Sequence, residues 1–159
     1  MVHKLLNGLS VAETEQVLAL GSRLTIASGG SLFRLGDSAD HLYLIERGRI
    51  RLSFPMMLRG QQEEVSIEDI VPGETVGWSA MVPPFRFTLS ATAPLETELI
   101  ALPREAFCAF LERSPEIGRQ LAFNLVLLVG QRLQLVQTMW MREIQRVVEL
   151  RSAMAIPIQ

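Results

Sequence analysis

The sequence predicts a mainly β fold with flanking helices, in which a jelly-roll (a double-stranded β-helix, or β-roll) is followed by a short helix and a long C-terminal helix. Short apolar runs separated by Gly or Pro turns fill residues 23–102, which is typical of an antiparallel sandwich or roll. After Pro103 the apolar residues recur at helical spacing. From Pro115 that spacing continues to about Ser152 without another proline or a stop signal.

The N-terminal segment predicts a helix ahead of the roll. Ser10 and Glu13 have the Ser-x-x-Glu spacing of a capping box, in which each side chain accepts a hydrogen bond from the other residue's backbone N–H. We expect this helix to run to about Leu20 and to end at Gly21, because glycine readily adopts the left-handed conformation that closes many helices.

The roll is predicted to contain seven strands, at residues 23–28, 31–35, 41–46, 49–54, 64–71, 87–93 and 97–102. A tight hairpin is expected at Arg47-Gly48-Arg49, and a longer loop at 55–62. The predicted domains are residues 1–113 for the roll with its N-terminal helix and the short helix after it, 114–152 for the long helix, and 153–159 for a tail.

The long helix carries a stripe of apolar residues. At about 1.5 Å per residue the helix reaches roughly 50 Å, which is longer than a domain of this size needs. One heptad spacing is apolar at every position except Glu143, and its apolar residues are Val126, Val129, Leu133, Val136, Trp140, Val147 and Leu150. Such a heptad predicts a left-handed helix pair, and so a homodimer, with folding back onto the chain's own domain as the alternative. A second face is expected to pack on the strands: Ile117, Leu121, Leu125 and Leu128.

Composition and charge argue against several function classes. The 159 residues are 48% hydrophobic and 20% charged with a formal net charge of −2, which differs from the basic surface of nucleic-acid-binding proteins. The N-terminus lacks the features of a signal peptide, and the most apolar later run, 121–130, is too short to span a bilayer. The lone Cys108 is expected to be a buried, inert thiol. These features predict a cytoplasmic protein without membrane contact.

The sequence also lacks a recognisable catalytic constellation. His3 and His41 have no Cys or carboxylate at metal-ligand spacing. Neither a Walker loop nor a GxSxG nucleophile motif occurs. We therefore expect neither an enzyme nor a metal site.

The stretch PGETVGWSAMVPPFRFTLSA (72–91) predicts a cradle for a small anion. Gly77 permits a tight turn, and the next four residues form one helical turn whose first N–H groups, at Ser79, Ala80 and Met81, can face an anion. On an extended segment Arg86 and Thr88 share one face, opposite the phenylalanines. The candidate ligand-binding residues are Gly77, Trp78, Ser79, Ala80, Met81, Arg86, Phe87 and Thr88.

Two of these residues leave alternatives open. Arg86 either faces the pocket, where it binds a phosphate, or faces solvent while Phe85 and Phe87 fill the ligand space. Trp78 either stacks on a flat ligand or fills a core beside Met81 and the phenylalanines.

Several stretches, in order along the chain, are similar to the cyclic nucleotide-binding domain family known from the Crp/Fnr regulators. They are FRLGDSADHLYLIERGRIRL (33–52), VPGETVG (71–77) and ETELIALPREAFCAFLERSPEIGRQLAFNLVLLVGQRLQ (96–134). The resemblance implies a β-roll, a small cassette helix and a long helix that hinges or pairs on ligand binding.

The ligand cassette departs from what the resemblance implies. In ligand-binding members a glutamate after the second glycine accepts hydrogen bonds from the ribose, and Trp78 stands there. Phe85 occupies the slot of the phosphate-binding arginine. Where many members offer a Thr or Ser to the base, this chain has Leu135, Val136 and Gln137. These replacements predict the loss of the standard cyclic AMP or cyclic GMP contacts, because indole only donates hydrogen bonds and a buried phosphate needs a cation.

The sequence therefore predicts a stand-alone ligand-sensing regulatory module, related to Crp/Fnr, that signals through a dimerising C-terminal helix. Its ligand is expected to be a cyclic nucleotide or another small anion. The alternative is a ligand-independent dimeric scaffold that binds a protein partner. Crp/Fnr regulators carry a helix-turn-helix domain after the long helix, and the closing VVELRSAMAIPIQ predicts none, so direct DNA binding is not expected.

Overall fold

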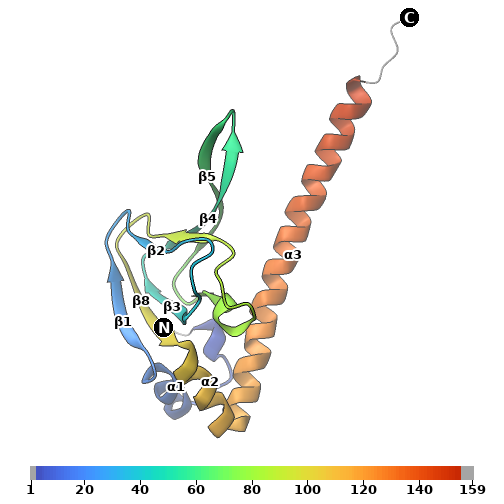
Figure 1. Ribbon diagram of the computed structural model, residues 1–159. Helices are drawn as coiled ribbons and strands as arrows, with labels where there is room; N and C mark the ends of the chain where they lie inside the picture. Colours follow the sequence, from blue (N-terminus) through green and yellow to red (C-terminus); the bar gives the residue numbers. More distant parts are fainter. Residues whose placement is uncertain (1–2, 155–159) are drawn as a thin grey trace, which may run out of the picture. The chain divides into compact units, whose positions relative to one another are not determined.

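The computed structural model describes residues 3–154, which contain two four-stranded antiparallel sheets and a long C-terminal helix (Figure 1). The strand orders are β1-β8-β3-β6 and β2-β7-β4-β5. The strands are β1 (Ser22–Ile26), β2 (Ser31–Phe33), β3 (His41–Arg47), β4 (Ile50–Leu58), β5 (Gln61–Ile70), β6 (Thr75–Val76), β7 (Ser90–Thr92) and β8 (Thr97–Pro103). The helices are η1 (Lys4–Leu6), α1 (Val11–Leu18), η2 (Trp78–Met81), α2 (Arg104–Arg113) and α3 (Pro115–Met154). The predicted fold class is confirmed.

Apolar side chains from both sheets form one buried cluster in the interior of the roll. Tyr43, Ile45 and Leu99 come from the first sheet, and Leu52 and Ala91 come from the second. Each large apolar side chain that is fully buried stabilises the fold by about 1.5–3 kcal/mol. This shared cluster is what holds the two sheets together.

Helix α1 confirms the predicted capping box but ends earlier than expected. The Ser10 N–H donates to Glu13 Oε2 at 2.7 Å, and the Glu13 N–H donates to Ser10 Oγ at 3.3 Å. The helix ends at Leu18, and Gly21 is not its left-handed cap. Gly21 lies against β8 instead, where an added Cβ would be 2.6 Å from Ile100 Cγ2. A side chain at this position would prevent the close approach.

The segment 47–49 is not a hairpin, because β3 and β4 belong to different sheets. The chain crosses from one sheet to the other at Gly48, whose φ is 88°. An added Cβ there would lie 2.5 Å from the Glu96 carbonyl oxygen. Thr97 Oγ1 accepts a hydrogen bond from the Arg49 N–H at 3.0 Å and so fixes the crossing. A glycine between two apolar runs gives no information about which strands pair.

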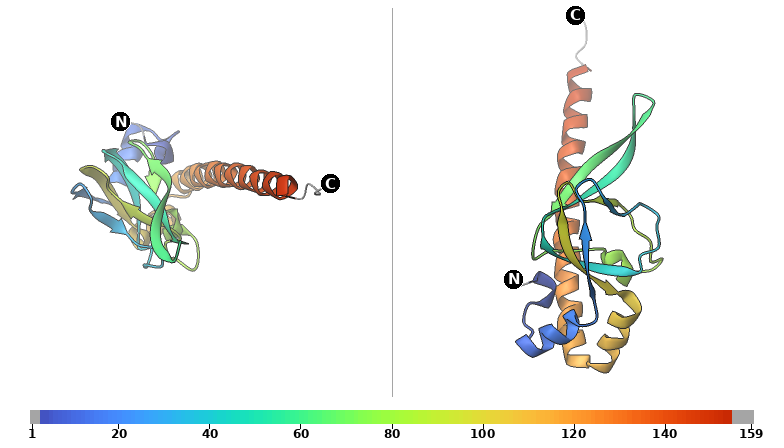
Figure 2. Two further views of the ribbon diagram at one scale, coloured as in Figure 1. Left: turned by 90° about the horizontal axis from the view of Figure 1, so that it is seen from above. Right: turned by 90° about the vertical axis from the view of Figure 1, so that its left-hand side faces the viewer.

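Strands β4 and β5 continue through the predicted loop at 55–62. Arg59 and Gly60 have φ of 52° and 81°, as the two-residue turns of twisted hairpins require. The hairpin extends well beyond β7 (Figures 1 and 2). Strand β7 pairs with β4 only at residues 51–53, so β4 has a free edge at Pro55. A proline is tolerated at such an edge, which is why the residue does not end the strand.

Helix α3 confirms the prediction of one long helix that begins at Pro115. By its internal contacts the chain divides into two compact units, residues 1–125 and 126–159, so the first turns of α3 belong to the unit of the roll. Most of the predicted tail, residues 155–159, lies outside the described residues. Within residues 3–154, no helix combines the length and the apolar character that crossing a membrane requires.

Candidate functional site

The turn at Gly77 has the geometry that the sequence predicts. Its φ is 87°, and an added Cβ would lie 2.9 Å from the His41 carbonyl oxygen. The following residues form the single turn η2, in which Ser79 and Ala80 are buried while Trp78 and Met81 are half-buried. The Ala80 N–H donates to the Gly77 carbonyl at 2.9 Å. That donor is therefore used within the turn, contrary to the expectation that it faces a ligand.

The segment 85–89 is not the extended strand that the sequence predicts. Phe85 has φ of 57°, and β7 begins only at Ser90. Backbone bonds hold residues 85–87 against the loop before β3, since the Ala39 N–H donates to the Phe85 carbonyl at 2.8 Å. The positive φ breaks the strict alternation of faces on which the predicted grouping of Arg86 with Thr88 rests.

Arg86 lies at the surface rather than in the interior. Its side chain is exposed, and Nη1 donates to the Gly36 carbonyl oxygen at 2.9 Å. Thr88 is exposed as well. Of the two alternatives for Arg86, the structure has the one in which the guanidinium faces solvent.

One of the two phenylalanines fills the interior. Phe87 is 5% exposed and stacks on Phe33 with ring centroids 3.6 Å apart and an interplanar angle of 8°. Phe33 also stacks on Tyr43, whose pKa is raised, mainly because burial disfavours the phenolate. Phe85 is 36% exposed and lies outside, with the Arg104 guanidinium carbon 4.5 Å from its ring centroid. Phe87, and not Phe85, therefore fills the interior of the roll.

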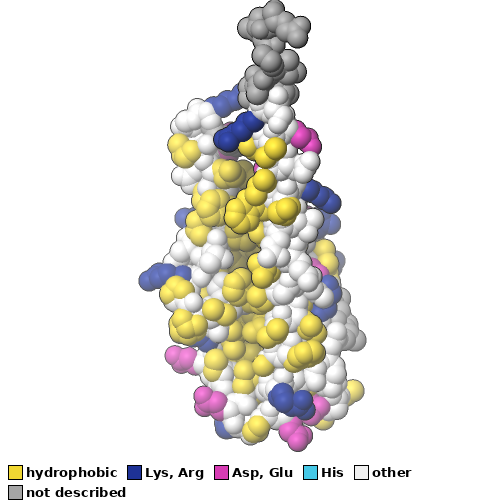
Figure 3. Space-filling view, turned by 90° about the vertical axis from the view of Figure 1, so that its right-hand side faces the viewer, with side chains coloured by type: hydrophobic (Ala, Val, Ile, Leu, Met, Phe, Trp, Pro, Cys, Tyr) yellow, Lys and Arg dark blue, Asp and Glu magenta, His cyan; other side chains and the backbone are white. Residues whose placement is uncertain are grey.

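The stripe of α3 is exposed in the structure. Trp140 is 67% exposed, Val129 is half-buried, and the other five predicted apolar positions are exposed. Hydrophobic side chains gather along this helix (Figure 3). The exposed apolar surface is also broader than the predicted stripe, because it includes Leu127, Leu135, Met139, Met141, Ile144 and Val148.

Asn124 is a structural residue that the sequence analysis missed. It is buried on α3, and its Nδ2 donates to the carbonyl oxygens of Leu5 and Asn7, each at 2.7 Å. Its Oδ1 accepts from Gln120 Nε2 at 3.1 Å. The amide therefore ties the N-terminal turn η1 to α3. The available signal is a single amide within the apolar run 121–130.

Comparisons with known proteins identify the family of this fold. The family model described as "Cyclic nucleotide-binding domain" matches residues 23–114. The "Cyclic AMP receptor protein" of Thermus thermophilus is 33% identical over 130 residues, which cover 82% of this chain and 57% of that protein.

Two solved structures extend the likeness. The Thermus thermophilus Catabolite Activator Protein has a TM-score of 0.71 at 30% identity, over 94% of this chain and 63% of that chain. The N-terminal domain of a transcriptional regulator from Streptomyces coelicolor has a TM-score of 0.67 at 26% identity, over 87% of this chain and 92% of that chain. The chain thus spans about three fifths of the length of the Thermus proteins. It belongs to the cyclic nucleotide-binding domain family and has the Crp-like regulatory form of that domain.

Proposed function

We propose that this chain is a regulatory module of the Crp type that works as a homodimer, with the apolar stripe of α3 as the pairing surface. The exposure of the stripe, from Val126 to Leu150, carries the proposal. A helix with so much apolar surface is typically covered by another element. A second copy presents the same 3-4 spacing, and a left-handed helix pair brings the two stripes together.

The free energy of burial is large enough for this pairing. Fully burying a Val or Leu is worth about 1.5–3 kcal/mol, and the stripe offers seven apolar positions on each chain. Association costs roughly 4–15 kcal/mol, so even partial burial exceeds it. The one polar position, Glu143, has Arg146 Nη1 at 3.8 Å from its Oε1, which reduces the cost of placing a carboxylate there.

Sedimentation equilibrium of the full chain tests the pairing. We expect twice the chain mass at micromolar concentration without any added ligand. A chain that sediments as a monomer at these concentrations contradicts the proposal.

The geometry favours pairing that is independent of cyclic nucleotide. The Phe33–Phe87 stack fills the interior, and the Arg86 guanidinium is bonded at the surface to Gly36. A cyclic phosphate bound in that interior needs a cation, and the residues described here do not fit an arginine-bound phosphate. In this ligand-independent mode the roll is a scaffold, and a protein partner binds the helix pair.

Ligand sensing at the cassette is the second candidate function. The observation that favours it is the preserved turn at Gly77 with η2, which keeps the cassette's backbone geometry. Binding of a cyclic nucleotide or another small anion in this mode requires Arg86 to leave the Gly36 carbonyl.

Calorimetric titration with cyclic AMP and cyclic GMP separates the two modes. A flat titration with a stable dimer supports the scaffold. Saturable micromolar binding that is lost in Arg86→Ala, but kept in Arg23→Ala, supports sensing. Arg23 is a suitable control because it is a strongly exposed arginine on β1, in the other sheet.

A further inference from the structure

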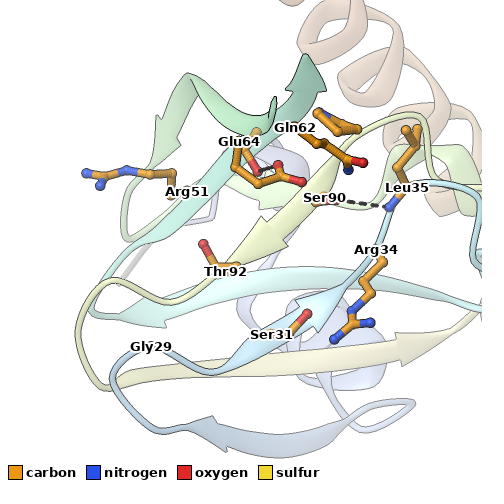
Figure 4. Close-up of a pocket in the computed structure, with 11 residues that line it drawn as sticks. Gly29, Ser31, Arg34, Leu35, Arg51, Gln62, Glu64, Ser90 and Thr92 are labelled. Atoms are coloured by element: carbon orange, nitrogen blue, oxygen red, sulfur yellow. Dashed lines mark hydrogen bonds between the residues drawn. The ribbon is translucent and has the colours of Figure 1, made fainter. Parts of the chain in front are cut away.

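A second candidate site lies on the outer face of the sheet β2-β7-β4-β5. A groove of about 740 Å³ is hollowed there (Figure 4), and its lining includes Ser31, Arg34, Ser53, Glu64, Ser90 and Thr92. The strand register pairs Ser53 with Ser90 and Ser31 with Thr92, which places these side chains on one face. Leu52 and Ala91 alternate with them and belong to the core cluster. The groove is therefore separate from the cassette.

Two register shifts lie in the strands that line the groove. The register shifts between Ser31 and Phe33 in the β2–β7 pair, and between Leu52 and Ser53 in the β4–β5 pair. Bulges bend a strand and increase its local twist, so the sheet is not flat beneath the groove. The floor of the groove, formed by Ser53, Ser90 and Thr92, is partly shielded from solvent, because Ser53 is buried and the other two residues are half-buried.

The floor and one wall are lined with hydroxyl and carboxylate groups. Ser53 Oγ donates to Glu64 Oε2 at 2.6 Å, which orients that carboxylate. Ser90 Oγ accepts from the Leu35 N–H at 3.1 Å and keeps its own proton to donate. The hydroxyls of Ser31 and Thr92 form no hydrogen bond with other residues in the described part of the chain. Such groups exchange hydrogen bonds with a polyhydroxyl compound.

The two arginines of the lining differ in their availability. Arg51 is held by Asp69, with 2.9 Å from Nε to Oδ1 and 3.1 Å from Nη2 to Oδ2, and it points away from the other lining residues in Figure 4. This pair lowers the pKa of the Asp69 carboxyl. The Arg34 guanidinium forms no ion pair or hydrogen bond with any other residue between 3 and 154. In Figure 4 it turns back toward Ser31.

The strand order sets the separation of the charges. Arg34 follows β2 and Glu64 lies on β5, at opposite edges of the four-stranded sheet. Three inter-strand spacings of about 4.8 Å separate the edges by roughly 14 Å along the sheet. A guanidinium binds phosphate with paired hydrogen bonds, whereas a carboxylate repels phosphate and accepts from hydroxyls. The end of the groove at Arg34 therefore suits an anionic group of a ligand. The floor is lined with hydroxyl groups, and the end at Glu64 accepts hydrogen bonds from ligand hydroxyls.

We propose that this groove binds a phosphorylated saccharide, with the phosphate on Arg34 and the sugar hydroxyls along Ser31, Thr92 and Glu64. A disaccharide phosphate has about the length that the strand spacing requires. The site is independent of the cassette, and so of whether the cassette binds a cyclic nucleotide.

Titration of the full chain with trehalose 6-phosphate, followed by ¹H–¹⁵N NMR, tests the proposal. We expect saturable shifts at the amides of Ser31, Ser90 and Thr92, with a dissociation constant of about 1 mM or lower. Trehalose and inorganic phosphate, each added alone, are expected to bind at least about tenfold more weakly. The Ser79 and Ala80 amides report the cassette in the same spectra, so binding there is distinguished from binding in the groove.

Matched variants locate the phosphate. Arg34→Gln is expected to weaken trehalose 6-phosphate binding about tenfold, because it removes one charge-assisted contact. Arg23→Gln, in the other sheet, is expected to leave the affinity unchanged. The proposal is overturned if the groove amides do not shift, if trehalose or phosphate alone binds as tightly, or if the two variants behave alike.

Discussion

The first turns of α3 and the rest of the same helix differ in how their apolar side chains are covered. Leu121 is 1% exposed and its neighbour Asn124 is buried, whereas Trp140 is 67% exposed. Both stretches carry large apolar side chains at helical spacing, so the sequence pattern does not distinguish them. The first stretch is buried within the unit of the roll, and the apolar side chains of the second are exposed. An apolar helix face is typically covered by another structural element, and its sequence does not say which element that is.

The largest expected effect is on dimerisation, from substitutions in the exposed stretch of α3. Leu133→Glu combined with Trp140→Glu places two uncompensated carboxylates in the proposed helix pair, and each costs several kcal/mol when buried. We expect the dimer dissociation constant to rise at least about a thousandfold. Sedimentation equilibrium measures it. Gln131→Glu, which lies opposite the stripe in the heptad, is the control, and equal dissociation in both proteins contradicts the assignment of the seam.

The second prediction concerns the interior of the roll. Phe87→Ala removes a buried ring from the stack on Phe33 and should lower the free energy of unfolding by about 3–5 kcal/mol. Phe85→Ala, two residues away and partly exposed, should cost less than about 1.5 kcal/mol, because it removes little more than the contact with Arg104. Urea unfolding measures both variants. Similar losses in the two would show that Phe87 does not close the interior.

The third prediction tests the covered stretch of α3. Asn124→Leu leaves the Leu5 and Asn7 carbonyls without their side-chain donor, and we expect a loss of about 2–4 kcal/mol in the free energy of unfolding. Gln120→Ala removes only the donor to Asn124 Oδ1 and should cost about 1 kcal/mol. Hydrogen exchange at the Leu6 and Leu9 amides should accelerate in Asn124→Leu. Unchanged exchange there contradicts the role of the amide as a tie to η1.

The smallest effect is a pH dependence from His3. Burial lowers the pKa of His3 below the ordinary histidine value of 6.5, and the charge of Glu46 partly opposes this shift. The Nδ1 atom is buried without a hydrogen-bond partner in the described part of the chain. The unfolded chain therefore binds the proton more readily, so stability is fully present above pH 6.5 and decreases as the pH falls below it.

Two variants check the sign of this dependence in urea unfolding at several pH values. His3→Phe should flatten the dependence between pH 6.5 and the lower pKa of the folded state. Glu46→Gln should steepen it, because the carboxylate that favours the imidazolium is gone. A stability that rises on acidification through this range excludes His3 as the cause.

Periodicity and local turn chemistry were sufficient to predict three local features. The capping box of Ser10 and Glu13, the turn at Gly77 and the long helix from Pro115 each depend on residues that are close in sequence. The same reasoning failed at Gly48, where the chain changes sheets, and at 55–62, where a strand continues through Pro55. Pairing partners are distant in sequence, so a local pattern does not contain them.

The candidate site shows the same division. The glycine that the cassette turn requires is evident from the sequence, and so is the replacement of the ribose glutamate by Trp78. The direction of the Arg86 side chain is not evident from the sequence, because it depends on the positive φ of Phe85 and on hydrogen bonds to residues 36–39. Phe85 and Phe87 are equally apolar, yet only Phe87 enters the core. The groove on the outer face is lined by strands that come together only in the folded sheet, so its polar residues are too scattered in sequence to be read as one site.

The sequence by itself determined the mainly β roll, its cassette turn and the apolar character of the long helix, because these follow from local spacing and glycine geometry. Only the tertiary structure decided which phenylalanine fills the interior, where Arg86 is held and that the start of α3 is buried within the unit of the roll. Those outcomes depend on contacts between segments far apart in the sequence, and such contacts exist only once the chain is folded.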